Sequence, residues 1–302
     1  MPAVILKIVF LKLLCLLITA SLFAQSTEIN QKRLSAVVIT GGLAYSASMI
    51  GLGSIWYQDL DKFHFFNDND GWGYMDKLGH IATAQHIGRL SAESLKWTGM
   101  DNTRAVWYGG MTGLVFLTSV EAFDGFSKDW GFSVGDVVAN ALGAGLFISQ
   151  ELLWQEQMFI MKWSYSASPY AQYRPELLGS NFSETWLKDY NGQTYWLSAN
   201  INSVFFRNAS FKPKWLNIAV GYGINGYTGA NRNPAENQAG QPIPDFQRYS
   251  QFYISPDVDL TKIPTRSKPL KVVLHVLNFV KVPLPGLEYN PKDGLQYHWF
   301  AF

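Results

Sequence analysis

Residues 133–166 read SVGDVVANALGAGLFISQELLWQEQMFIMKWSYS, and within this stretch the hydrophobic pattern changes its period. Ser133 followed by Asp136 has the spacing of a capping box, which predicts a helix that begins there and continues to about Trp154. Beyond Trp154 large apolar side chains follow the two-residue period of a strand; these are Phe159, Met161, Trp163 and Tyr165. The chain is therefore predicted to have an α+β fold, helical before this point and strand-rich after it.

Three more helices are predicted on the N-terminal side of this stretch. Leu34–Gln58 contains no charged residue and is long enough to cross a bilayer, which takes about 20 residues. An amphipathic helix is predicted at Asp76–Trp97, and Asp101 is placed to cap a third helix that ends near Phe123. Residues 30–155 should thus form an apolar, membrane-associated domain of about four helices. The first helix either spans the membrane or lies buried in the bundle.

Residues 156–302 are predicted to form a strand-rich, antiparallel region. Further period-two runs occupy residues 197–205, 216–222, 252–260 and 295–299. A short amphipathic helix is predicted at 269–280, and the Asn-, Gln-, Gly- and Pro-rich stretch 230–244 predicts a mobile loop. The aromatic strand that ends at Phe302 is similar to the sorting signal of outer-membrane barrels, but single-chain barrels begin at about eight strands, and about six are visible here. The pattern favours a small sheet packed against the helices and leaves part of a barrel as the alternative.

The first residues have the features of a secretory signal peptide. Two lysines accompany an apolar run that continues to Phe23, and a plausible cleavage point follows at Ala24. Residues 1–24 are therefore predicted to be a signal peptide that is removed on export. The only cysteine, Cys15, is preceded by leucines rather than by the small residues that a lipoprotein signal needs. Lipid attachment is not expected, and the mature protein should contain no disulfide.

Composition and charge restrict the classes of function. Charged residues make up 16% of the chain and aromatic residues 15%, whereas about 25% charged residues is usual in a water-soluble domain. This balance is typical of a protein that rests against lipid, because amphipathic rings are stable at the headgroup level. The formal net charge of +1 gives no basic excess for nucleic acid. We expect an exported, periplasmic and membrane-associated protein of the cell envelope, with the outer membrane as an open alternative.

Polar residues gather at a few places on the otherwise apolar helices and form a candidate site. Asp76 and His80 are four residues apart, as are Asp136 and Asn140, so each pair shares a helix face. Asp76 and Asp136 lie in first turns, where the helix dipole stabilises an anion by roughly 0.3–1 kcal/mol, so plain capping is enough to explain them. The full candidate set is Asp76, Lys77, His80, Glu121, Asp124, Ser127, Ser133, Asp136 and Asn140.

Two carboxylates of this set are harder to explain. Glu121 and Asp124 lie at the end of their helix, where the dipole opposes negative charge. They need a partner, and His80, Lys77 and Lys128 are the candidates. The set is interpreted either as a structural ion-pair network or as a proton-transfer or metal site. No cofactor is expected, and metal ligation is left open.

Three of these patterns, taken in order, resemble a known family. They are Asp76-Lys77-x-x-His80, Glu121-x-x-Asp124-Gly125-x-Ser127, and Gly131-Phe132-Ser133-x-x-Asp136 with Asn140. Over about Tyr74–Gln150 they resemble the YfiM-like predicted periplasmic lipoproteins, domain of unknown function 2279, and they are loosely similar to VanZ-like membrane proteins. The strand-rich half looks like an extension seen in Bacteroidetes-type members. The resemblance implies an envelope location and supports treating the polar set as one unit; it implies no activity.

Two functions stay open at this point. The leading hypothesis is a non-enzymatic envelope protein, structural or binding, whose partner is membrane lipid or another envelope protein, with no nucleic acid. The alternative is a membrane-embedded hydrolase or transferase acting on lipid or cell-wall material, with His80 as base and Glu121 and Asp124 as acid or metal ligands. The chain has no His-Glu-x-x-His pair, which favours the first hypothesis.

Overall fold

In the part of the chain that the structure describes, four long helices precede the sheet, in the order that the hydrophobic pattern predicts. The computed structural model describes residues 29–56, 59–128, 130–206 and 213–302, so the expected signal peptide with Cys15, and Gln58, lie outside the described residues. The helices are α2 (Gln31–Trp56), α3 (Met75–Trp97), α4 (Asn102–Asp124) and α5 (Val134–Trp154).

Both predicted caps are present. The Asp101 side chain accepts a hydrogen bond from the Arg104 backbone at the start of α4. Ser133 Oγ accepts one from the Asp136 backbone at the start of α5, at 3.2 Å. The second half of the Ser133 capping box is supplied from another helix, because Glu121 Oε2 accepts the Ser133 backbone N–H at 3.3 Å. This frees the Asp136 carboxylate from capping its own helix.

Glycines let α3 approach α4 and α5 very closely. A Cβ atom added at Gly113 of α4 would lie 2.3 Å from the carbonyl oxygen of Ala84, and one at Gly143 of α5 would lie 2.2 Å from that of Ile81. Real side chains do not tolerate such distances, so both positions need glycine. The polar residues of the three helices are brought together by these contacts.

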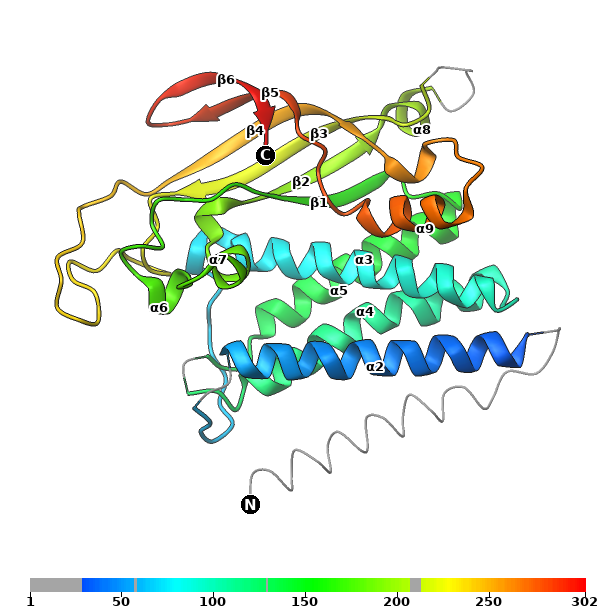
Figure 1. Cartoon of the computed structure of the whole chain (residues 1–302), viewed down its shortest axis with the longest axis horizontal. Coiled ribbons are helices and arrows are strands. Elements are labelled where there is room, and N and C mark those ends of the chain that lie inside the picture. The colour runs from blue at the N-terminus through cyan, green and yellow to red at the C-terminus, as the bar shows by residue number, and fades with distance from the viewer. Residues whose placement is uncertain (1–28, 57–58, 129, 207–212) are drawn as a thin grey trace.

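Among the described residues, two helices are long and apolar enough to cross a membrane, judged by length and composition: residues Gln31–Ser54 of α2, and α5. α5 packs against both α3 and α4 in the bundle, and these two also pack against each other. α2 is the helix farthest from the sheet in Figure 1, and its apolar side chains Val38, Leu43 and Ile50 are exposed.

Six antiparallel strands follow, each paired with its neighbour in the sequence. They are β1 (Phe159–Tyr165), β2 (Gln193–Asn200), β3 (Leu216–Asn225), β4 (Tyr249–Val258), β5 (Leu284–Asn290) and β6 (Gly294–Ala301). Short helices connect them: α6 (Pro175–Leu178), α7 (Phe182–Lys188), α8 (Ile201–Phe205) and α9 (Lys268–Leu277). Figure 1 shows the sheet on one side of the helices, which confirms the predicted α+β class.

Two details of the strand prediction are wrong. The run 197–205 is a strand only to Asn200, whose side chain caps α8 by accepting a hydrogen bond from the Ser203 backbone. A capped helical turn satisfies the backbone where alternation alone predicted more strand. The prediction also lacked β5, whose alternation is interrupted by Pro285 and Gly286, residues that are depleted in strands.

The outer edge of β1 is covered rather than left open. The Gln85 side chain of α3 binds the backbone of Met161 and Phe159, and Gln150 of α5 binds Phe159 as well. Farther along, Trp163 exchanges backbone hydrogen bonds with residues 279–281. Because an unpaired edge strand exposes its backbone groups, these contacts join the sheet firmly to the helices.

The sheet has its polar face buried and much of its apolar face exposed. On the buried face, Lys162 Nζ and Asp257 Oδ2 pair at 2.8 Å with neither side chain exposed. The opposite face packs on α3 at β1 and β2, but beyond the helices it exposes apolar and aromatic side chains. These are Leu197, Val220, Phe252, Ile254, Leu287, Tyr289, Leu295, Tyr297 and Trp299. An antiparallel sheet in water normally has the reverse arrangement.

Candidate functional site

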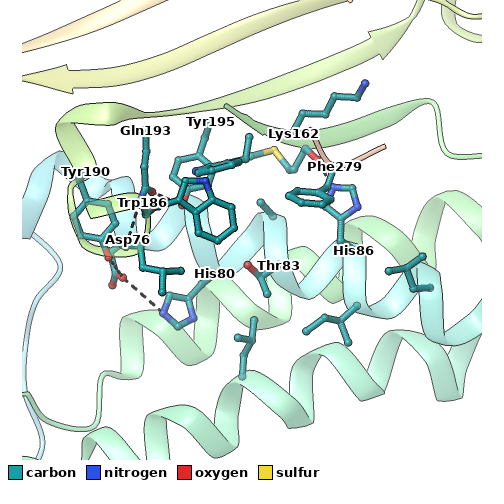
Figure 2. Close-up of a pocket in the computed structure, with 18 residues that line it drawn as sticks. Asp76, His80, Thr83, His86, Lys162, Trp186, Tyr190, Gln193, Tyr195 and Phe279 are labelled. Carbon is teal, nitrogen blue, oxygen red and sulfur yellow. Dashed lines mark hydrogen bonds and ion pairs between the residues drawn. The ribbon is translucent and has the colours of Figure 1, made fainter. Parts of the chain in front are cut away.

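A pocket of about 420 Å³ lies where α3 meets β1, β2 and α7. Asp76, His80 and Thr83 follow one another at helical spacing, so α3 presents all three to the pocket. Figure 2 shows Asp76 and His80 at one end, Trp186 in the middle and Phe279 at the other end. Most of the wall is apolar, so the pocket has one polar end and a hydrocarbon-lined body.

His80 is held by one amide and faces three carboxylates. Its Nδ1 lies 2.9 Å from Asn140 Oδ1, and since an amide oxygen only accepts, Nδ1 carries the proton. Its Nε2 lies 3.8 Å from Asp76 Oδ1, 3.5 Å from Glu121 Oε1 and 3.6 Å from Asp136 Oδ1. Three helices therefore direct polar groups at one ring nitrogen.

Lys77 neutralises part of this acidic group. Its Nζ lies 2.7 Å from Asp68 Oδ1, 2.8 Å from Asp136 Oδ1 and 3.2 Å from Asp76 Oδ2. Burial opposes the charged ammonium, but Asp76 and Asp136 outweigh it and raise the pKa of Lys77 above its usual value. Tyr190 also donates a hydrogen bond to Asp76 Oδ1 at 2.7 Å.

Glu121 is the least compensated acid of the site. Its side chain is 2% exposed, and among the described residues no lysine or arginine pairs with it. Burial, followed by the charges of Asp136 and Asp124, raises the pKa of Glu121 to about 10. Burial and the charge of Asp76 likewise raise the pKa of Asp136 to about 7. The site thus holds more carboxylates than its own cations can balance.

The structure brings seven of the nine candidate residues into direct contact: Asp76, Lys77, His80, Glu121, Ser133, Asp136 and Asn140. Asp124 contributes its charge to Glu121, and Ser127 is buried in the turn after α4. Of the partners suggested for Glu121, His80 is adjacent, whereas Lys77 pairs with other acids. Asp136 caps nothing with its carboxylate, so capping alone does not explain it.

Sequence reasoning missed Asp68 and Tyr190. Asp68 lies in the loop before α3, where Ser133 Oγ donates to it at 2.7 Å. Tyr190 follows α7, a short helix in a stretch without a clear period. Neither residue carries a local signal, because their contacts join segments that are far apart in the chain.

Ser133 is a helix cap and not a nucleophile, although Gly131-x-Ser133-x-Gly135 has the spacing of a nucleophile elbow. Such an elbow holds its serine exposed on a strained turn between a strand and a helix. Ser133 is instead 1% exposed and has ordinary extended backbone angles, φ −96° and ψ 117°. Its hydroxyl is engaged by Asp68 and by the α5 backbone.

His86, at the far end of the pocket, should make the fold sensitive to acid. Burial, aided by the charges of Arg89 and Lys162, lowers the pKa of His86 from 6.5 to about 3, although its Nε2 contacts the Met161 carbonyl oxygen. A lowered histidine pKa means that the unfolded chain takes up the proton first as the pH falls. His86 therefore leaves the free energy of unfolding unchanged above about pH 6.5. Between about pH 6.5 and pH 3 the free energy of unfolding falls by about 1.4 kcal/mol per pH unit.

Urea unfolding between pH 4 and pH 8 would measure this. His86→Gln is expected to flatten the loss of stability below pH 6.5, and His64→Gln in the loop before α3 is expected to leave it unchanged. Equal acid slopes in wild type and His86→Gln would contradict the assignment.

Comparison with known proteins concerns this helical part of the chain. Residues 64–150 match the model of a family described as Predicted periplasmic lipoprotein (DUF2279), which confirms the family resemblance over that segment. The segment contains the whole candidate set, from Asp76 to Asn140. No curated protein and no solved structure matches the chain significantly. The family description supports an exported, periplasmic protein of the envelope; the likeness to VanZ-like proteins and the Bacteroidetes-type extension stay predictions.

Proposed function

We propose that this protein is a non-enzymatic, membrane-associated module of the cell envelope that binds a single-chain amphiphile. The observation that carries the proposal is the pocket beside α3, whose body is apolar and whose end holds Asp76 and His80. Its volume of about 420 Å³ lies within the range of roughly 300–1,000 Å³ that is usual for small-molecule pockets. An acyl chain fits the apolar wall, and a polar headgroup fits the end.

The charge of the site selects the headgroup. Asp76 is 28% exposed and His80 15%, and both line the pocket. Behind them lie Glu121 and Asp136, with Lys77 as the nearby cation. An acidic end of this kind repels a free carboxylate or phosphate monoester and favours a headgroup that ends in an ammonium. A lysophosphatidylethanolamine has that chemistry.

Two exposed apolar surfaces support membrane association. The first is α2, with exposed Val38, Leu43 and Ile50. The second is the apolar face of the sheet at β3–β6, where Tyr297 and Trp299 are exposed. Exposed apolar surface of this extent is unusual on a soluble monomer and is typical of contact with lipid or with another protein. Contact with lipid would bring the pocket to the source of its ligand.

Filling the pocket is expected to abolish amphiphile binding. Thr83 is exposed and lines the pocket. The indole of Thr83→Trp should therefore occupy the space of the ligand's acyl chain without disturbing the protein core. We expect the affinity for lauroyl-lysophosphatidylethanolamine to fall at least tenfold, measured by isothermal titration calorimetry below the critical micelle concentration, with the protein in amphipol and EDTA.

Thr112→Trp is the matched control. Thr112 is also an exposed helical threonine, on α4, and it does not line the pocket. It should bind as the wild type does. Equal binding by Thr83→Trp and wild type would overturn the proposed site, and absence of binding by wild type would overturn the proposed ligand class.

The hydrolase or transferase hypothesis stays a second candidate because His80 Nε2 faces three carboxylates at the pocket's polar end. This is an arrangement that general acid–base chemistry uses. Turnover separates the two functions. Release of free fatty acid or headgroup from the bound lysolipid, lost in His80→Gln, would favour the enzyme; binding without release would favour the module.

A further inference from the structure

We infer that Asp76, His80 and Asp136 form a binding site for a divalent transition-metal cation at the polar end of the pocket, with Glu121 as a fourth ligand. The cation site shares Asp76 and His80 with the polar end of the pocket, but the argument for it uses residues of the helices alone and does not require the proposed amphiphile. One ligand atom from each of the three residues lies within 4.8 Å of the others.

The tautomer of His80 suits a metal ligand. Its Nδ1 lies 2.9 Å from Asn140 Oδ1, which can only accept, so in the neutral imidazole that ligates a metal the lone pair is on Nε2. Metal-binding histidines are oriented in this way by a hydrogen bond from the other ring nitrogen. Asn140 is fully buried, so it fixes the ring in this orientation. The free lone pair points to the side where the carboxylates gather.

The distances fit a shared ion better than direct hydrogen bonds. His80 Nε2 is 3.5–3.8 Å from the three carboxylate oxygens, whereas an N–H···O hydrogen bond is about 2.7–3.2 Å long. Two ligands that are each about 2.1 Å from a tetrahedral cation lie roughly 3.4 Å apart. The observed spacing therefore leaves room for an ion among His80 Nε2 and the oxygens of Asp76 and Asp136, with small side-chain adjustments. Glu121 Oε1 lies beside them, 3.5 Å from His80 Nε2.

The burial of the carboxylates gives a second indication. Asp136 Oδ1 is fully buried, and its close cationic partner among the described residues is Lys77 Nζ at 2.8 Å, which Asp68 and Asp76 share. The same oxygen faces His80 Nε2. Glu121, 2% exposed, has no lysine or arginine partner among the described residues. Buried carboxylates are normally paired or bound to a metal.

The charges of the group match a divalent ion. Metal ligation requires ionised carboxylates, and with Glu121 and Asp136 ionised the four acids Asp68, Asp76, Glu121 and Asp136 contribute four negative charges, of which Lys77 offsets one. A dication would reduce the remaining excess from three charges to one. The mixed donor set favours Mn²⁺ or Zn²⁺, because Ca²⁺ and Mg²⁺ take oxygen ligands only and imidazole suits the transition metals.

The test uses tag-free mature protein and Mn²⁺ alone. We expect the six-line electron paramagnetic resonance signal of free Mn²⁺ to disappear on binding at one site. Electron spin echo modulation from one ¹⁴N nucleus is expected, and Zn²⁺ should displace the Mn²⁺ because it binds such ligands more tightly. His80→Gln is expected to remove the ¹⁴N modulation, and Glu121→Gln and Asp136→Asn are each expected to weaken binding at least tenfold.

His275→Gln is the matched control, because His275 pairs with the single carboxylate Glu93 at 3.0 Å. It should keep both binding and modulation. Wild-type binding weaker than about 1 mM, or equal loss of modulation in His275→Gln and His80→Gln, would overturn the site. Circular dichroism reports whether each variant is folded. If His80→Gln does not fold, Glu121→Gln tests the site instead, because it keeps the shape of the side chain.

This experiment contains no lipid, and the amphiphile titration contains EDTA. The Mn²⁺ experiment therefore tests the cation site alone, and the lysolipid titration tests the amphiphile pocket alone. Mn²⁺ bound with ¹⁴N modulation but no lysolipid binding would uphold the cation site alone.

Discussion

Replacing Asp257 with alanine is expected to lower the free energy of unfolding by about 3–5 kcal/mol, the usual cost of leaving a buried charge without its partner. Lys162 Nζ lies 2.8 Å from Asp257 Oδ2, and neither side chain is exposed. Among the described residues the ammonium also donates a hydrogen bond to the Val258 carbonyl oxygen, which cannot neutralise it. In a chain of this size the melting temperature should fall by about 10 °C, and urea unfolding would give the free energy.

Two controls make this result specific to the buried charge. Glu156→Ala removes the acid of a partly exposed pair with Lys262 and should cost less than about 1 kcal/mol. The double variant Lys162→Met with Asp257→Leu should recover more than half of the loss, because apolar side chains often replace a buried ion pair at little cost. A loss below about 1 kcal/mol for Asp257→Ala would show that water reaches the pair.

The elements that were predicted correctly are those with local causes. The helices α4 and α5 begin where Asp101 and Ser133 cap them, and each cap depends on residues only three apart. Most strands were found because period two is a local pattern. The error after Asn200 has the same origin, since a side-chain cap overrides alternation.

The candidate site was predicted in part for the same reason. Asp76 and His80 share a helix face by spacing alone, and dipole reasoning identified Glu121 as an acid in need of a partner. The partners themselves come from distant segments: Asn140 is 60 residues from His80, and Tyr190 is 114 residues from Asp76. Those contacts depend on how closely three helices pack, which no single segment reveals.

The close packing that builds the site gives the second large effect. Gly143→Ala is expected to destabilise the protein by about 3 kcal/mol, the upper end for overpacking. The new Cβ would lie 2.2 Å from the Ile81 carbonyl oxygen, and backbone cannot move aside as a flexible side chain can. α5 would be displaced from α3, and Asn140, one turn earlier on α5, would be displaced from His80.

Gly145→Ala, on the same helix, is the control with the opposite sign. A Cβ atom there meets nothing within 4 Å, so alanine should stabilise the helix by about 0.5–1 kcal/mol. Thermal unfolding should therefore separate the two variants by about 10 °C, and Mn²⁺ binding should weaken in Gly143→Ala alone. Equal stabilities of Gly143→Ala and Gly145→Ala would show that α3 and α5 do not approach as closely as the structure describes. If Gly143→Ala is destabilised but binds Mn²⁺ as the wild type does, the cation site does not depend on the position of α5.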